Sequence, residues 1–334
     1  MALGLFGQAF NNAGNSDANI TRSHLNKVNV DTTVQEKAIA FPTDARLYYK
    51  MREALVRAAE SRDIVLRQNY RRLAKRALSK QGHYSHAKQY RRARRETKRL
   101  KTMLGRVYRD ILRKINNPDE PLIEQLKRAE KLLLQEKNDS HKLYSVHAPE
   151  VECIAIGKVH KRNEFSNKVG LVTTNRDNWI VGVQAFHDNP FDGHTLPACL
   201  SETKRYTGWQ PAEAYVDRGY RGHAVDPKET QVHIVDWRHM KRKTRAVRYW
   251  FKRRSAIEPV FGHLKSDHRM SRNYLKGRDG DQINAVLRAC GYNLRKLRAV
   301  FFLPEKIWRL VQRLAVKYLS FLGRSTSNLH FSYN

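Results

Sequence analysis

The chain has 334 residues, 40% of them hydrophobic, which excludes wholesale disorder and allows one large domain or two smaller ones. Its 64 Lys and Arg residues outnumber 32 Asp and Glu residues, which gives a formal net charge of +32. Such an excess opposes compaction, so it favours a polyanionic partner, with nucleic acid ahead of an anionic membrane surface. Three widely separated cysteines exclude a disulfide framework, and no apolar run approaches the roughly 20 residues of a membrane-spanning helix.

The N-terminal part of the chain is predicted to be a tail followed by one strand. Residues 1–27 are rich in Asn, Ala and Gly and are expected to be flexible. The β-branched run over 28–34 predicts a strand. Thr43 or Asp44 then supplies the N-cap of a helix.

The residues from 44 to 144 are predicted to be helical. Helix-forming residues dominate up to about Lys114 without an internal proline, and the stretch 82–85 is expected to divide them into two long helices. Pro121 starts a further helix, because proline is tolerated in the first helical turn.

This helical segment carries a concentrated positive charge. Between Arg62 and Lys114, 19 Lys and Arg residues stand against three acids, which is half of the formal net charge. A charge run on a helix is usually a solvated face, but a solvated face has no reason to be so one-sided. We therefore predict an arm that contacts a phosphate backbone, with its densest cluster at Arg91, Arg92, Arg94 and Arg95.

After residue 145 the sequence is typical of strands and then of helices again. Five segments have the apolar, β-branched pattern of strands: 151–156, 167–174, 179–186, 214–217 and 231–235. A turn over 190–193 and a helix from 194 to about 207 separate the third of these from the fourth. Helix returns from about Thr244.

This order of elements predicts an α/β fold, a mixed sheet flanked by helices and interrupted by a long basic helical insertion. The sheet domain would comprise 28–43 and 145–300, and the insertion 44–144. Residues 301–334 would form an amphipathic helix and a tail. The apolar stripe of that helix could lie on a membrane surface, but packing against the core or a second subunit is the better interpretation, so no membrane partner is expected.

Three acids have positions that suit a metal site. Asp31 is predicted at the end of the first strand, and Asp217 ends another strand before a glycine-bearing loop, where α/β sheets place ligands. On position alone, each aspartate is better explained as a turn or cap residue. Glu258 is the only acid in the cationic segment 241–266, so it is either an ion-pair partner of Arg254 or a metal ligand.

Phosphodiester chemistry explains why three distant carboxylates would be needed. It requires in-line geometry and positive charge beside the oxygens that become more negative, which two Mg²⁺ ions about 3.5–4 Å apart supply. Mn²⁺ is a possible substitute. Pro259 cannot donate a backbone hydrogen bond, so the helix is expected to kink or restart at Glu258.

The blocks around these acids resemble those of DDE transposases from bacterial insertion sequences, in particular insertion-sequence family five. The blocks are VNVDTTVQEKAIAFPTDARL, AYVDRGYRGH and RRSAIEPVFGHLKSDHRMSRNYLKG. That family has the signature Tyr-x2-Arg-x3-Glu-x6-Lys at its third acid, and the matching residues here are Phe251, Arg254, Glu258 and Lys265. The segments 147–150 and 189–196 resemble further family segments, and the blocks follow in the family's order.

The resemblance implies an RNase H-like fold and a transposase that cuts transposon ends and joins them to target DNA. Asp31, Asp217 and Glu258 would be catalytic and would hold the two metal ions, while Phe251, Arg254 and Lys265 would contact DNA. Double-stranded DNA would be the partner of a homodimer, and the protein would be cytoplasmic and associated with the nucleoid. Asp192 and His194 also match a family motif, and a structural turn is the preferred explanation of both.

Two departures from the family pattern leave alternatives open. Fewer than 30 residues precede the first strand, where relatives have a helical domain that reads the element ends, so the chain could be a truncated, inactive copy. Phe251 lacks the hydroxyl of the family tyrosine, which predicts reduced activity if that hydroxyl contacts DNA. A non-enzymatic basic DNA-binding protein would explain the charge alone, and a nuclease without strand transfer would use the same metal site.

Overall fold

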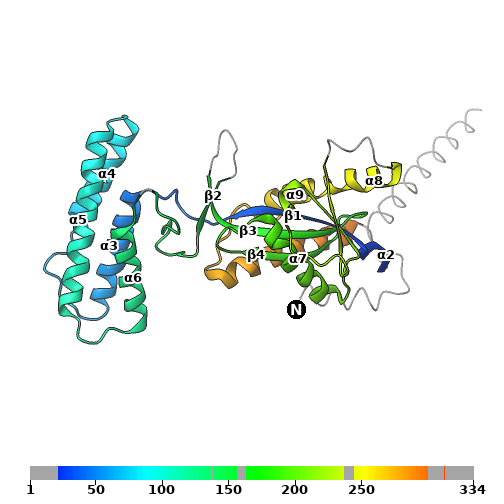
Figure 1. Ribbon diagram of the computed structural model, residues 1–334. Helices are drawn as coiled ribbons and strands as arrows, with labels where there is room; N and C mark the ends of the chain where they lie inside the picture. Colours follow the sequence, from blue (N-terminus) through cyan, green and yellow to red (C-terminus); the bar gives the residue numbers. More distant parts are fainter. Residues whose placement is uncertain (1–21, 137, 156–162, 237–243, 300–311, 313–334) are drawn as a thin grey trace, which may run out of the picture.

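The computed structural model describes residues 22–136, 138–155, 163–236, 244–299 and 312 (Figure 1). Most of the expected tail and, apart from Gln312, the expected helix within 301–334 lie outside the described residues. Figure 1 shows a sheet with its covering helices and, at one end of the molecule, a separate bundle of helices. None of the described helices is long and apolar enough to cross a membrane.

The sheet is mixed and has six strands, in an arrangement compatible with an RNase H-like fold. The long strand β3 pairs antiparallel with β1 on one side and with both β2 and β4 on the other. β5 pairs parallel with β1, and β6 pairs parallel with β5. The bounds are Lys27–Glu36 for β1, Glu152–Ala155 for β2, Asn163–Thr174 for β3, Ile180–Phe186 for β4, Glu213–Val216 for β5 and Gln231–Ile234 for β6.

The period-two alternation of the strands assigns their side chains to two apolar layers. Val28 and Val30 of β1 pack with α7 (Asp192–Thr207) on one face of the sheet. Leu171 of β3 packs on the other face, against α9 (Ile257–Ser266) and the helix over 277–299. α7 lies very close to the sheet, because Gly170 and Gly182 leave room where a Cβ atom would meet the side chains of Cys199 and Thr203.

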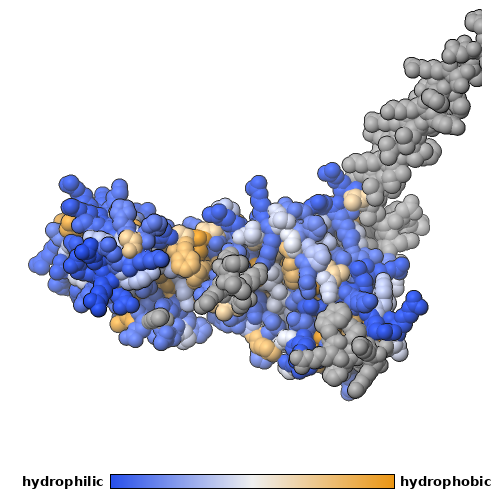
Figure 2. Space-filling view, turned by 90° about the horizontal axis from the view of Figure 1, so that it is seen from above, coloured by the Kyte–Doolittle hydropathy of each residue, from blue (hydrophilic) through white to orange (hydrophobic). Residues whose placement is uncertain are grey.

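Between β1 and β2 the chain forms four helices with a core of their own. They are α3 (Asp44–Glu60), α4 (Arg71–His86), α5 (Tyr90–Lys114) and α6 (Glu120–Leu134). Leu55, Leu104, Leu122 and Leu132 are among the side chains fully buried in this core. Hydrophilic residues cover most of the bundle when it is seen from above (Figure 2). The role of these helices as a basic insertion stays a prediction.

The helix boundaries in this bundle differ from those predicted. The stretch 82–85 does not divide two helices but lies inside α4, where Gly82 has open space around it. The chain instead turns at 61–70 and at 87–89, where Asp63, Tyr70 and Lys88 have φ values of 56°, 54° and 57°. These residues in the left-handed conformation let α3, α4 and α5 fold back on one core. The helix-forming residues on either side did not predict these turns. A short helix, α2 (Arg22–Leu25), also precedes β1 where a flexible tail was expected.

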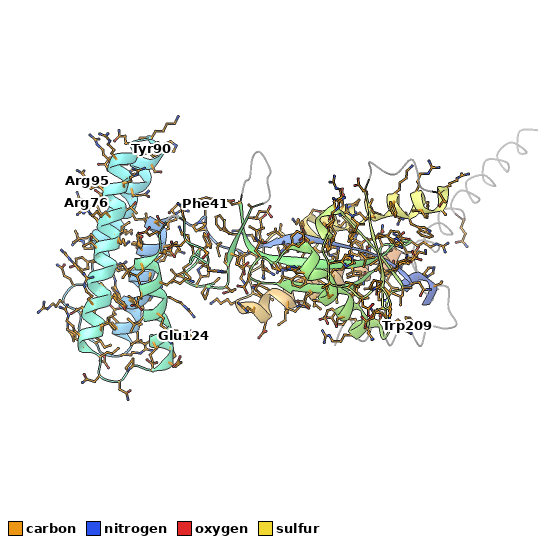
Figure 3. The ribbon with its side chains drawn as sticks, in the orientation of Figure 1. Phe41, Arg76, Tyr90, Arg95, Glu124 and Trp209 are labelled. Carbon is orange, nitrogen blue, oxygen red and sulfur yellow. The ribbon has the colours of Figure 1, made fainter. Side chains whose placement is uncertain are left out.

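A buried polar cluster lies where the chain leaves the sheet and returns to it. Lys37, just after β1, pairs with Asp281 at 2.6 Å and with Glu150, just before β2, at 2.8 Å. All three side chains are at most 8% exposed. Phe41, which lies beside the bundle in Figure 3, stacks edge-on against Phe165 of β3 with ring centroids 5.4 Å apart. These contacts tie both connections of the bundle to the sheet.

Candidate active site

Asp31 and Asp217 lie side by side because β1 and β5 are parallel neighbours. Their register pairs Asn29 with Tyr215, and two residues further along the same register would pair Asp31 with Asp217. Asp31 lies in the middle of β1, not at its end as predicted, because β1 continues to Glu36 along β3. β5 itself ends at Val216, one residue before Asp217.

The local backbone orients each of the two aspartates. Asp31 lies opposite Leu171, so its side chain is on the face of the sheet covered by α9. Its Oδ1 accepts a hydrogen bond from the Thr32 amide at 2.8 Å. Asp217 caps a short 3₁₀ helix, η1 (Arg218–Tyr220), where its Oδ1 accepts from the Gly219 amide at 2.8 Å.

Glu258 reaches the same place from two short helices. α8 (Arg245–Arg254) ends with Arg254, and α9 starts again at Ile257, so the break expected at Glu258 is confirmed, with the restart one residue earlier. Ile257 is fully buried in the layer under α9. Glu258 therefore lies in the first turn of a helix anchored over the sheet, with its side chain directed outward and 65% exposed.

Arg254 connects all three acids. Its Nη2 is 2.7 Å from Asp31 Oδ2 and 3.5 Å from Asp217 Oδ2, and its Nη1 is 3.6 Å from Glu258 Oε1. One guanidinium thus contacts carboxylates from a central strand, a neighbouring strand end and a helix. The structure brings together the three residues that the sequence singled out.

Burial and neighbouring charges act against ionisation of Asp31. Desolvation by burial raises its pKa to about 7, against a lowering by Arg254, and the charges of Asp217 and Asp192 raise it further. Without a metal ion, part of the Asp31 population is therefore protonated near neutral pH. Carboxylates this close repel one another strongly where solvent screens poorly, and the Arg254 guanidinium reduces that repulsion.

Asp192 is a fourth carboxylate beside this site, and the sequence did not assign it a chemical role. Its Oδ1 accepts from the Thr32 hydroxyl at 2.9 Å and from Lys168 Nζ at 3.0 Å. Lys168 also donates to the Pro190 carbonyl at 2.7 Å, which fixes the loop before α7. Asp192 starts α7, whereas His194 is exposed and stacks on Phe191. The resemblance of 189–196 to a family segment was the only signal for Asp192.

The other predicted DNA contacts fall into two groups. Phe251 is buried, 6.0 Å from the Tyr215 ring between centroids, so the structure shows it in a packing role. Lys265 is half-buried on α9. The four α5 arginines are exposed, and Figure 3 shows Arg95 on the side of the bundle turned away from the sheet. DNA contact by any of them stays a prediction.

The donor set fits a divalent cation. Asp31, Asp217 and Glu258 offer hard carboxylate oxygens from rigid elements, and these oxygens surround one positively charged group. Among the described residues, no three His, Cys, Asp or Glu side chains already lie in a metal-binding geometry. The carboxylates are spread around Arg254, so a metal ion would have to draw them together.

Comparison with known proteins gives one family and one relative. Residues 215–298 match the family model described as a transposase DDE domain, which supports a DDE transposase. The matched segment includes Asp217, Arg254 and Glu258 but not Asp31. An uncharacterized protein, ORF8 in the nfe locus of Rhizobium meliloti, is 59% identical over 66 residues, which are 20% of this chain and 32% of that protein. No solved structure matches the chain.

Proposed function

We propose that the chain is a DDE transposase of the insertion-sequence family five type, which cuts DNA at transposon ends and transfers the cut strand to target DNA. The observation that carries the proposal is the convergence of Asp31, Asp217 and Glu258 on Arg254 from three separate elements. The match of residues 215–298 to a transposase DDE domain supports it independently.

In the proposed reaction the three carboxylates would hold two Mg²⁺ ions, for which Mn²⁺ could substitute. Bound there, the ions would supply a nucleophile at neutral pH and charge stabilisation for the leaving oxygen. Asp31 and Asp217 are oriented by backbone amides at one edge of the cluster, while the exposed Glu258 completes it on the side open to solvent. Asp192 and Lys168 position Thr32, and with it the strand that carries Asp31.

The bundle α3–α6 is proposed to bind the DNA backbone outside the reacting bond. Arg91, Arg92, Arg94 and Arg95 are exposed on α5, as a phosphate-binding surface requires. A cavity of about 410 Å³ between α3, α4 and α5 is lined by Arg94, Lys98 and Lys101 together with Tyr48. Its three cations suit a phosphate chain, and we expect a homodimer bound to two DNA ends.

The decisive experiment is to replace Glu258 by Gln and to assay cleavage. Purified protein is incubated with DNA that carries the candidate element ends and Mg²⁺, and nicks are mapped at nucleotide resolution. We expect wild-type cleavage at the ends and a loss of at least about 100-fold in the E258Q variant, since even a residue that only supports a metal ligand is worth about 10–100-fold. The matched control is E124Q, an exposed acid on α6 that pairs with Arg128.

The alternatives give different results in the same assay. A non-enzymatic DNA-binding protein would shift the DNA without nicking it in either form. A nuclease would nick the ends but fail to join pre-cut ends to a target plasmid. Unchanged cleavage by E258Q would overturn the assignment of Glu258.

A further inference from the structure

Arg254 occupies the centre of the carboxylate cluster and is held there almost entirely by the acids. One nitrogen, Nη2, contacts both Asp31 and Asp217, at 2.7 Å and 3.5 Å. The other terminal nitrogen is 3.6 Å from Glu258. The side chain is only 10% exposed, and its buried Nε has no hydrogen-bond partner among the residues that the structure describes.

The adjacent arginine is held in a different way. Arg253 donates from Nε to the Asn175 carbonyl at 3.0 Å and from Nη2 to the Arg176 carbonyl at 2.7 Å. It also donates to Asn178 Oδ1 at 3.1 Å. Arg253 therefore ties α8 to the loop after β3, whereas Arg254 leaves one buried donor unsatisfied and serves the acids.

A divalent cation and the Arg254 guanidinium need the same oxygen atoms. Mg²⁺ binds carboxylate oxygens at about 2.0–2.1 Å, which places it where the inward lone pairs of Asp31 Oδ2 and Asp217 Oδ2 already meet Nη2. A metal ion bound there would lie close to the Arg254 guanidinium, and two such cations repel each other strongly where solvent screens poorly. The side chains of Asp217 and Glu258 are 44% and 65% exposed, so an incoming ion has access from solvent.

We propose that the Arg254 guanidinium is a built-in countercation of the carboxylate cluster, and that a divalent cation binds only by displacing it. Arg254 stabilises the acids before metal arrives, and the same contacts lower their affinity for metal. By linkage, a ligand that binds Arg254 and draws it away from the acids raises the affinity of the acids for metal. Bound metal raises the affinity for that ligand by the same factor. The inference rests on the proposed function of the three acids as metal ligands.

The test compares Mn²⁺ binding by calorimetry, without DNA, in the wild type and in R254Q. We expect R254Q to bind Mn²⁺ more tightly, by a factor between about 5 and about 150, the usual range of coupling between two ligands of one protein. In EDTA, R254Q should melt at a lower temperature than the wild type, because its acids lack their countercation. Saturating Mn²⁺ should raise the melting temperature of R254Q more than that of the wild type.

Two further variants separate the possible failures. R253Q removes the neighbouring charge, whose hydrogen bonds go to two backbone carbonyls and Asn178 and not to the acids, so its Mn²⁺ affinity should change far less than that of R254Q. D31N should abolish the Mn²⁺ binding that the wild type, R254Q and R253Q all show. If D31N leaves Mn²⁺ binding unchanged, the acids are not the metal site and the proposed function itself fails.

If D31N abolishes binding but R254Q binds Mn²⁺ no more tightly than the wild type, only the countercation role is wrong. Should R254Q not fold, R254M carries the test, since the flexible methionine side chain fills much of the same space and carries no charge. R254M should then bind Mn²⁺ more tightly than the wild type. Equal or weaker binding by R254M would overturn the inference.

Discussion

Asp31 is the most enclosed of the three acids, with a side chain 17% exposed against 44% for Asp217 and 65% for Glu258. This gradient follows from their elements, because Asp31 lies inside a strand paired on β3 while Glu258 lies on an outer helix. Enclosure is the main reason why the pKa of Asp31 is raised.

The raised pKa of Asp31 predicts a pH dependence of stability. Its pKa is about 7 in the folded protein against 3.8 in the unfolded chain, so between these values the folded state binds more protons. Stability from this group is therefore lost as pH rises, by at most about 1.4 kcal/mol per pH unit. We expect metal-free wild type to lose more stability than D31N from about pH 4 to about pH 7, measured by urea unfolding in EDTA. If the unfolding free energies of the wild type and D31N change with pH in parallel, Arg254 keeps Asp31 ionised.

At the scale of elements, α8 positions Arg254 through a small core of its own. Phe251 packs with Tyr215 of β5 and Val235, and this cluster holds the end of α8 over the strand that leads to Asp217. The aromatic side chain at this position therefore explains the placement of Arg254, whatever else it contacts. The sequence pattern drew attention to position 251 for a different reason, the missing hydroxyl.

Truncation of Phe251 should loosen α8 from the sheet. F251A removes a side chain that is 5% exposed, and we expect a loss of about 3–5 kcal/mol in the free energy of unfolding. The control is Y249A on the same helix, where the ring is 51% exposed and the loss should stay below about 1 kcal/mol. Urea unfolding followed by circular dichroism measures both. Equal losses would mean that the cluster does not anchor α8.

The basic helices give a second prediction at this scale. Arg91 and Arg95 lie one turn apart and exposed on α5, and Lys127 and Lys131 have the same spacing and exposure on α6. The R91Q/R95Q pair should weaken DNA binding and reduce the log–log salt slope by up to about 1.8, because each lost phosphate contact removes about 0.9. K127Q/K131Q should change the slope much less. Equal slopes for the two pairs would show that net charge, not the α5 surface, binds DNA.

At the scale of the whole molecule, the buried cluster of Lys37, Glu150 and Asp281 joins the two connections of the bundle to the sheet. Each of these side chains is nearly inaccessible, and Lys37 is the only cation of the three. Asn273 also donates to Asp281 at 2.6 Å. Without Lys37, two carboxylates would remain buried, and the nearest basic group that the structure describes beside Asp281 would be His187, at 3.9 Å.

Removal of the cation should therefore be costly. K37M is expected to destabilise the protein by about 3–5 kcal/mol, as breaking a buried pair leaves an uncompensated charge. R71M breaks the exposed pair of Arg71 with Glu60, in which both side chains are at least half exposed, and should cost less than about 1 kcal/mol. Thermal unfolding of both variants measures the two losses of stability. A loss below about 1 kcal/mol for K37M would mean that the acids are protonated or hydrated there.

The sequence by itself indicated the strands and most helices, because these depend on side-chain periodicity and on residue types close together in the chain. The resemblance to a transposase family, together with the cationic surroundings of Glu258, singled out the three acids. The sequence also indicated the break in the helix near Glu258, because Pro259 has no backbone N–H to donate. The α/β class followed from the order of these elements. Local sequence patterns predict secondary structure where the burial of nearby side chains determines it.

Only the tertiary structure decided how these parts meet. The parallel register of β1 and β5 places Asp31 beside Asp217, and the packing of α8 on β5 brings Arg254 between them. The contact of Asp192 with Thr32 likewise joins residues far apart in the chain. Such contacts depend on strand order and helix packing, which no window of sequence contains, so the countercation at the centre of the site became visible only in three dimensions.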